Sequence, residues 1–454
     1  MRFRSLRIVL LGLLSLLPAG AGRPEAAPSP ALPAGVAPLP PEAAQHFQEL
    51  LAAAEKYRGL TARQPVPAGT LAEPELRKKI AESLVKETSP EELRNVEIGA
   101  KAFGLIPESM DLSRYIPELL TSQVAGFYDP ERDYMALVRR PGESQGTEEQ
   151  QNAEDVVIVH ELTHALQDQH FDLKKFDQAD PLSESATARS ALAEGDATLT
   201  MTSFIAGANV ETLPGIGEAM RRFLDDPARL ADASDVPGGA DLARAPAWIR
   251  DSLLFGYAHG FAFCLDVRRL GGQKLLDYAF SADPPRSSEQ ILHPEKWHTR
   301  RDDPIVLRWP DLSAALPGWT KVSEGELGEA AIQTLLREPV HSRKRADAAA
   351  AGWGGDRFTV YERDGRRVLV WWTEWDSEAD AREFQAAARK LGSGWRLEAL
   401  SPRRVQAVRG ELTREQRAAV RSRLAVAEAA APANRAIDLK VLGVGESAPQ
   451  NGRP

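Results

Sequence analysis

The sequence predicts an α+β protein that has a mainly helical larger domain, expected over residues 42–340, and a small C-terminal α+β domain, expected over 353–412. Three observations lead to this prediction. Helical patterns surround one long apolar helix near residues 147–169. A β-hairpin pattern comes directly before that helix. Strand, strand, helix and strand patterns then follow one another near the C-terminus, which is typical of a compact α+β unit.

The composition narrows the classes of function. The chain has 454 residues and a formal net charge of −9, so it can form a core of its own and lacks the basic surface that nucleic-acid binding requires. We therefore expect no nucleic-acid partner. Cys264 is the only cysteine, which excludes an intrachain disulfide. Its apolar surroundings favour a buried structural thiol over a nucleophile.

The N-terminus reads as a targeting signal. Arginines precede a short apolar run, Ile8–Leu17, and an A-x-A cleavage pattern ends at Ala21. We expect a cleavable signal peptide over residues 1–21, and hence a secreted or periplasmic protein with no membrane span in the mature chain. An uncleaved anchor is the alternative. The Pro- and Ala-rich stretch 22–41 is expected to be a linker.

The sequence pattern of residues 124–138 predicts the β-hairpin that comes before the apolar helix. Two runs rich in aromatic and β-branched residues flank the turn Asp129-Pro130-Glu131-Arg132-Asp133. An ordinary structural hairpin is the favoured interpretation. The alternative is an exposed edge strand that accepts a peptide as an additional strand.

The apolar helix contains the motif H-E-x-x-H at His160, Glu161 and His164. Histidines at positions i and i+4 lie on one helix face, so both imidazoles can reach one zinc ion. Glu161 lies beside them and can act as the general base that takes a proton from the attacking water. Histidines and a glutamate in a buried helix also need polar partners, and a metal ion supplies one.

Two residues compete as the third zinc ligand. His170 gives the metzincin spacing H-E-x-x-H-x-x-Q-x-x-H, with Gln167 where that family has glycine. Without the glycine turn the helix continues, and His170 then lies about 15 Å along the axis from His160. Glu194 is on a second helix, expected to begin at a serine cap and to end at Gly207, and is favoured. We expect Gly195 to let the two helices approach closely.

The motif at His160–His164, followed by Ala193-Glu194-Gly195, resembles the gluzincin group of zinc metallopeptidases, and more closely a set of uncharacterised secreted bacterial H-E-x-x-H proteins. The resemblance covers residues 126–297 and implies a zincin-like fold with Glu194 as a zinc ligand. Asp196 is a candidate to orient a ligand histidine. It departs from the E-x-x-x-D spacing of gluzincins, where this chain has Thr198.

Peptide hydrolysis also needs a donor for the oxyanion that forms at the attacked carbonyl. Tyr257 and His293 are tentative candidates by residue type. Tyr257 lies in a helix expected over residues 248–270. His293 follows Glu289 by four residues, a spacing that is more often a helix-surface ion pair than a metal site.

The predicted function is a secreted zinc metallopeptidase that binds Zn²⁺ and acts on a peptide or protein substrate. The alternative is a non-catalytic zinc-containing binding or structural protein on a peptidase scaffold. A precursor in which residues 42–120 cover the cleft is a third possibility. The small C-terminal domain is expected to pack or to hold substrate, and residues 413–454 are expected to form a helix and a disordered tail.

Overall fold

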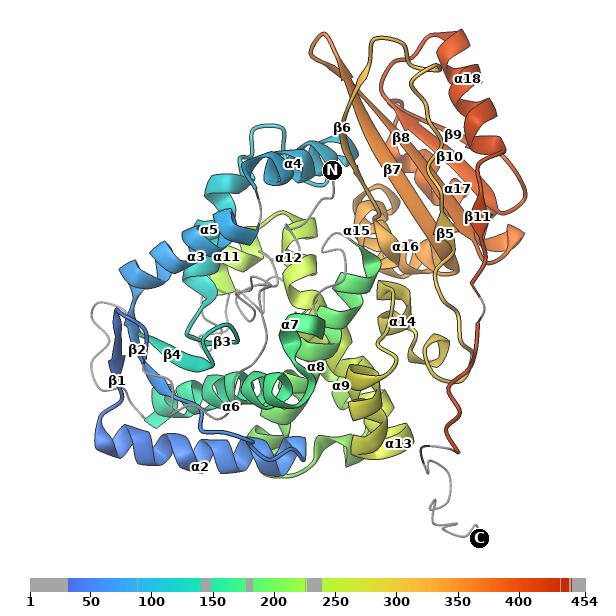
Figure 1. The fold of residues 1–454 in the computed structure, drawn as a ribbon. Coiled ribbons are helices and arrows are strands. Elements are labelled where there is room, and N and C mark those ends of the chain that lie inside the picture. The colour runs from blue at the N-terminus through green and yellow to red at the C-terminus, as the bar shows by residue number, and fades with distance from the viewer. Residues whose placement is uncertain are drawn as a thin grey trace.

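The computed structural model describes residues 32–87, 89–139, 148–176, 183–224, 226, 239–432, 434–440 and 442. A helical body comes first along the chain, and a sheet module follows it (Figure 1). The predicted α+β class is confirmed. The expected signal peptide, the first half of the expected linker and Thr147, the expected cap of the motif helix, lie outside the described residues.

The described part of the body contains a four-stranded sheet, many helices and a π-helical turn, η2. Its elements are β1 (Val36–Pro38), α2 (Pro41–Arg58), β2 (Ala68–Ala72), α3 (Glu73–Glu87), α4 (Pro90–Phe103), α5 (Leu112–Gln123), β3 (Gly126–Asp129), β4 (Tyr134–Arg139), α6 (Glu148–Phe171), α7 (Leu173–Phe176), α8 (Glu184–Ala206), η1 (Val210–Thr212), α9 (Ile216–Leu224), α11 (Gly239–Arg244), α12 (Ala247–Phe255), η2 (Gly256–Gly260), α13 (Phe261–Ser281), α14 (Ser288–Leu292) and η3 (Pro294–Lys296).

The sheet module follows. Its elements are β5 (Val306–Leu307), β6 (Thr320–Gly325), α15 (Gly328–Val340), α16 (Arg343–Ala350), β7 (Trp353–Arg363), β8 (Arg366–Trp375), α17 (Glu378–Ala388), η4 (Arg389–Leu391), β9 (Trp395–Ala399), β10 (Arg404–Arg409), α18 (Arg414–Ala425) and β11 (Ala429–Ala430).

The predicted hairpin forms as β3 and β4, which pair antiparallel. It belongs to a larger sheet of order β1-β2-β4-β3, in which β2 and β4 are parallel. β1 lies within the stretch that was expected to be a linker. This part of the stretch forms a strand because Val36 packs in a core cluster with Leu71 of β2. β3 is an edge strand, but all four of its residues are buried.

Helix α6 crosses the body beneath this sheet, with α2 alongside it (Figure 1). Leu162 and Leu166 pack with Phe47 and Leu50 of α2 in one hydrophobic cluster, so the motif helix is held on several sides. Helix α8 begins at its Ser183 cap and ends at Gly207 in the left-handed conformation, at the predicted bounds.

The helix expected over residues 248–270 is interrupted. α12 gives way to η2, whose wider turn is closed by a hydrogen bond from the Phe261 N–H to the Gly256 carbonyl. The helix does not end at the Gly271-Gly272 pair, as its predicted range required. Gly272 adopts φ 62°, ψ −158°, and α13 continues beyond this kink to Ser281.

The sheet module begins earlier than residue 353, where the small domain was expected to start. Its sheet has the order β6-β7-β8-β10-β9, and β6 lies before the expected boundary. Ile332 and Leu336 of α15 are buried in the same cluster as Trp371 of β8, so this helix also belongs to the module. Local patterns located the strands, but the boundary depends on which elements share a core.

The chain after α18 also differs in part from the expected tail. Ile437 is buried against the helical body, and the Asp303 N–H donates a hydrogen bond to the Asn434 side chain at 2.9 Å. Residues 443–454 lie outside the described part of the chain. Within that part, none of the helices combines the length and apolar character needed to span a membrane.

Candidate metal centre

Helix α6 brings His160 and His164 together. The helix is buried from Ile158 to Gln167, so both side chains point into the protein interior. Their exposed fractions are 5% and 1%, and their Nε2 atoms are 3.1 Å apart. The predicted i, i+4 geometry therefore places two imidazole nitrogens at one point.

Glu194 of α8 completes this cluster. Its Oε2 atom lies 3.3 Å from Nε2 of His160 and 3.8 Å from Nε2 of His164. One ligand atom from each of the three residues lies within 4.8 Å of the others. The carboxylate that the sequence favoured is thus next to both histidines.

Gly195 allows a close approach, but not the one expected. A Cβ atom on Gly195 would lie 2.1 Å from the carbonyl carbon of Gly260, so the glycine fits α8 against the π-helical turn rather than against α6. Gly256 in the same turn faces Glu194, since a Cβ there would lie 2.6 Å from the Glu194 Cβ. These glycines fix the turn and the carboxylate against each other.

The other predicted residues divide into two groups. Tyr257, in η2, stacks on the His160 ring at 5.6 Å between centroids and hydrogen-bonds Glu194. His170 remains on the uninterrupted α6 helix, where its ring is hydrogen-bonded to the Thr61 carbonyl at 2.8 Å. His293 lies 3.0 Å from Glu329 and is one-third exposed. Neither His170 nor His293 joins the cluster.

A chain of buried polar groups orients His164. The Gln167 amide nitrogen donates to Asp196 at 2.8 Å and to the Ala193 carbonyl at 3.0 Å. These two acceptors fix the amide, so its oxygen accepts from the His164 Nδ1–H at 2.9 Å. His164 consequently presents the lone pair of Nε2 to Glu194 and His160.

Arg58 of α2 supports this chain from behind. Its Nε donates to Asp196 at 2.5 Å and its Nη1 donates to Asp277 of α13 at 2.9 Å, while the side chain is fully buried. Asp196 therefore acts on His164 through Gln167, not directly as the sequence suggested. The sequence analysis did not identify the roles of Gln167 and Arg58. It noted Gln167 only because metzincins have a glycine at that position. Arg58 lies 138 residues from Asp196, so no local pattern connects the two.

Glu161 lies beside the cluster and is 5% exposed. Its Oε2 accepts a hydrogen bond from the Tyr128 N–H of β3 at 2.9 Å, which fixes the carboxylate against the sheet edge. Burial and the nearby Glu194 charge raise the pKa of Glu161 well above its ordinary value. A carboxyl group in this environment holds a proton more readily than an exposed glutamate does.

Burial also sets the protonation of the three clustered side chains. It lowers the pKa values of His160 and His164 to about 4, so both are neutral at pH 7. Burial raises the pKa of Glu194 to about 7, although His164 and the Tyr257 hydroxyl act in the opposite direction. The set thus has two neutral imidazoles and a carboxyl group that titrates near neutrality.

The residues fit a zinc ion. Two imidazole nitrogens and one carboxylate oxygen form a set of three protein ligands, which zinc uses at catalytic sites. Within the described residues, Glu194 Oε2 is buried and has no hydrogen-bond partner. A shared cation would compensate the cost of burying the carboxylate.

A second acidic cluster, formed by Glu289, Asp302 and Asp376, already has its cation. Lys296 Nζ lies 2.6 Å, 3.0 Å and 2.7 Å from these three carboxylates. Glu289 is therefore paired with Lys296 and not with His293. This cluster is an ion-pair network that joins α14 to the sheet module.

Comparison with known proteins identifies only the C-terminal part. Residues 316–438 match a protein-family model described as a domain of unknown function (DUF8575). This segment covers most of the sheet module, while His160, His164 and Glu194 lie outside it. No curated protein and no solved structure matches the chain.

Proposed function

We propose that this chain is a secreted or periplasmic zinc metallopeptidase of the gluzincin type with a zincin-like body. The convergence of His160, His164 and Glu194 beside the buried Glu161 is the observation that supports it. His160, His164 and Glu194 would hold the ion. Zinc, when bound, would supply a Lewis acid that activates water and polarises a peptide carbonyl.

Glu161 moves the proton. Its carboxylate takes a proton from the attacking water and delivers it to the nitrogen of the departing amine. The Tyr128 N–H holds one carboxylate oxygen at 2.9 Å, which leaves the other oxygen for this transfer. A cation bound by Glu194 would also favour the charged form of Glu161 in the resting enzyme.

Tyr257 supplies a hydroxyl donor. Burial and the nearby carboxylates raise its pKa well above the ordinary value, so the hydroxyl keeps its proton at every working pH. Its ring is fixed on the His160 imidazole. Its one proton is donated to Glu194 in the structure, so Tyr257 would serve the carbonyl oxygen by transferring that hydrogen bond as negative charge develops there.

The decisive variant is Glu161→Gln. We expect it to retain zinc by elemental analysis and to lose about 10²–10⁴-fold in peptide hydrolysis, because only the proton acceptor is removed. Glu118→Gln, at an exposed position of α5, is the matched control. Full activity in Glu161→Gln would exclude the mechanism.

A non-catalytic zinc protein is the second candidate, and it too has a supporting observation. The exposed fractions of the four central residues do not exceed 5%, as in closed structural zinc sites. A casein or peptide-library assay with and without a chelator separates the candidates. Zinc-loaded protein that cleaves nothing in any condition would favour the structural role.

A further inference from the structure

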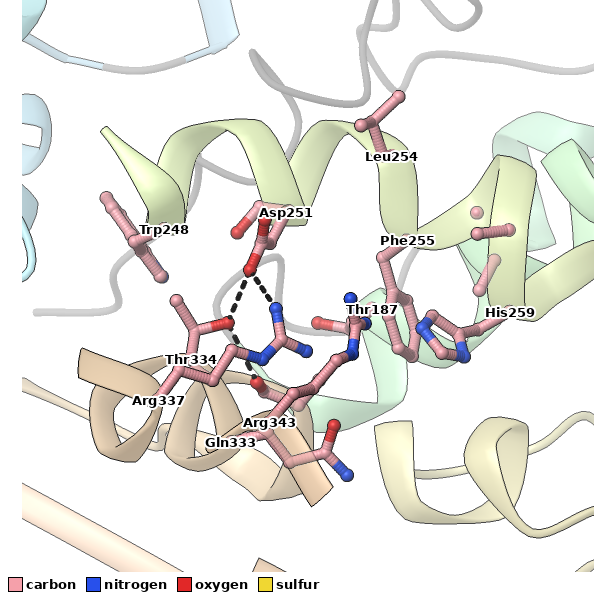
Figure 2. Close-up of a pocket in the computed structure, with 16 residues that line it drawn as sticks. Thr187, Trp248, Asp251, Leu254, Phe255, His259, Gln333, Thr334, Arg337 and Arg343 are labelled. Atoms are coloured by element: carbon pink, nitrogen blue, oxygen red, sulfur yellow. Dashed lines mark hydrogen bonds and ion pairs between the residues drawn. The ribbon is translucent and has the colours of Figure 1, made fainter. Parts of the chain in front are cut away.

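The interface between the helical body and the sheet module contains a cluster of three polar side chains, Asp251, Thr334 and Arg337. Asp251 of α12 accepts a hydrogen bond from the Thr334 hydroxyl of α15 at 3.0 Å, and it is ion-paired with Arg337 of the same helix. Figure 2 shows the three side chains meeting between α12 and α15. Oδ2 of Asp251 makes both contacts, while Oδ1 accepts from Arg250 at 3.2 Å. The module is therefore attached to α12 through one carboxylate oxygen.

Helix α12 continues directly into the π-helical turn. Phe255 (φ −57°, ψ −46°) and Gly256 (φ −61°, ψ −46°) both have helical backbone angles, so α12 and η2 form one continuous segment. Asp251 and Tyr257 both lie on this segment. Since a helical segment moves largely as a rigid unit, a displacement of α12 at Asp251 is transmitted to Tyr257.

This segment is packed closely against the metal centre and loosely against the module. A Cβ atom on Gly256 would lie 2.6 Å from the Glu194 Cβ, which leaves no room for movement in that direction. Where the segment faces α15, a cavity of about 60 Å³ is lined by Phe255 and Ala258 on one side and by Ala331 on the other (Figure 2). A cavity removes packing contacts from the residues that line it. The polar contacts of Asp251 therefore carry much of the attachment between this segment and α15.

Tyr257 is the side chain that this segment directs to the metal centre. Its ring stacks on His160 at 5.6 Å between centroids, and its hydroxyl hydrogen-bonds Glu194. A hydrogen bond weakens steeply when its distance or angle departs from the preferred range. The position of α12 thus determines how well the hydroxyl reaches the carboxylate.

We propose that Asp251 is a positioning residue for the metal centre: held by Thr334 and Arg337 of the module, it fixes α12 and η2 and thereby places the Tyr257 hydroxyl at Glu194. Thr334 and Arg337 lie in the segment that matches the family model, residues 316–438, and Asp251 lies outside it. One role of the module is then to hold the metal centre in shape. The placement of Tyr257 is a property of the metal-free chain, and only its effects on zinc binding and hydrolysis rest on the proposed function.

Tyrosine NMR on the full-length, metal-free protein tests this placement. The chain has seven tyrosines, so labelling their rings with ¹³C gives few signals, and the signal lost in Tyr257→Phe is that of Tyr257. Asp251→Asn removes the charge and keeps the size of the side chain, and we expect it to shift or broaden the Tyr257 signal selectively. Asp241→Asn, which breaks an exposed ion pair with Arg244 on α11, is the matched control and should leave the Tyr257 signal unchanged.

Zinc affinity, measured by competition with a chelator, shows whether Asp251 acts through Tyr257. We expect Asp251→Asn to weaken zinc binding about tenfold, because the hydrogen bond that orients the Glu194 carboxylate is displaced. The same substitution should have no further effect in Tyr257→Phe, since the hydroxyl through which it acts is already missing. A contact that merely stabilises the fold would weaken zinc binding equally in both backgrounds.

Thr334→Val keeps the side-chain shape, removes the hydroxyl that donates to Asp251, and should move the Tyr257 signal even if Asp251→Asn folds poorly. An unmoved Tyr257 signal in both variants, movement of every tyrosine signal in both, or an equal loss of zinc affinity with and without the Tyr257 hydroxyl would overturn the proposal. Protein that binds no zinc would count against the proposed function alone, and the Tyr257 signal would then decide the placement.

Discussion

At His164, the orientation of one amide decides which ring nitrogen faces the cluster. Gln167 accepts from Nδ1–H because its own nitrogen is committed to Asp196 and Ala193. The lone pair on Nε2 is thereby fixed before any ion arrives. A site prepared in this way loses little entropy when it binds a metal.

Removing that amide should therefore weaken metal binding without touching a ligand. We expect Gln167→Ala to lower zinc affinity by about 10–100-fold, measured by competition with a fluorescent chelator. Gln48→Ala, an exposed glutamine of α2, is the matched control. Unchanged affinity in Gln167→Ala would mean that packing alone orients His164.

The protonation of the cluster predicts a shallow dependence of zinc affinity on pH. Between about pH 5 and pH 6 the Glu194 carboxyl is protonated in the metal-free protein, since its pKa is about 7, whereas His160 and His164, with pKa values of about 4, are neutral. One proton must leave Glu194 when it becomes a ligand, so affinity rises with pH by about tenfold per unit.

This slope is best measured in Glu161→Gln, where the neighbouring carboxyl cannot add a proton of its own. Histidines with ordinary pKa values near 6.5 would instead release additional protons and give a slope approaching three. A slope of two or more would contradict the assignment of neutral histidines.

At the scale of elements, the contact between α8 and η2 positions Glu194. A methyl group on Gly195 would meet the backbone of Gly260 at 2.1 Å and of Phe261 at 2.6 Å. We expect Gly195→Ala to lower the free energy of unfolding by about 1–3 kcal/mol and to reduce zinc content, because α8 must shift with its carboxylate. Gly394→Ala, with nothing within 4 Å of the added atom, serves as the control for thermal unfolding.

Several elements were predictable because their signals are local. The motif helix, the hairpin and the capped helix α8 follow from periodicity, turn residues and a serine cap. The parallel pairing of β2 with β4 was not predicted, because it joins residues 67 positions apart through contacts that leave no local pattern. The π-helical turn at Gly256–Gly260 has the periodicity of an ordinary helix in the sequence, and it became evident only from the close packing against α8.

The residues of the candidate site also fall into those that local sequence patterns predict and those that only the tertiary structure brings together. His160, Glu161 and His164 form one short motif, and Glu194 was favoured as their partner on a second helix. The polar chain through Gln167, Asp196 and Arg58 depends on three different helices, so spacing along the sequence could not indicate it. By residue type a structural role was favoured for both Tyr257 and His293, and more strongly for Tyr257, yet the three-dimensional arrangement brings Tyr257 to the cluster and leaves His293 outside it.

At the scale of the whole molecule, the body and the sheet module share a core. Phe103 of α4 lies against the rings of Phe358, Trp371 and Trp395, at 5.0 Å, 5.2 Å and 5.9 Å between centroids. The two parts should therefore unfold together in one cooperative transition.

Phe103→Ala tests this coupling. We expect a loss of about 3–5 kcal/mol in stability, with tryptophan fluorescence of the module and zinc release from the body shifting by the same amount in denaturant. Val426→Ala, at a side chain that is 82% exposed, should leave both transitions unchanged. Separate shifts of the two signals would show that the parts unfold independently.

The π-helical turn η2 has a consequence for sequence length. A hydrogen bond from Phe261 to Gly256 spans five residues where an α-helix spans four, so the turn accommodates one extra residue. Deleting a single residue between 256 and 260 would restore a regular helix and rotate everything after it by about 100° relative to α12. Tyr257 or its neighbours would then no longer be directed toward His160. We therefore expect proteins that have this centre to tolerate substitutions in the turn more readily than a change in its length.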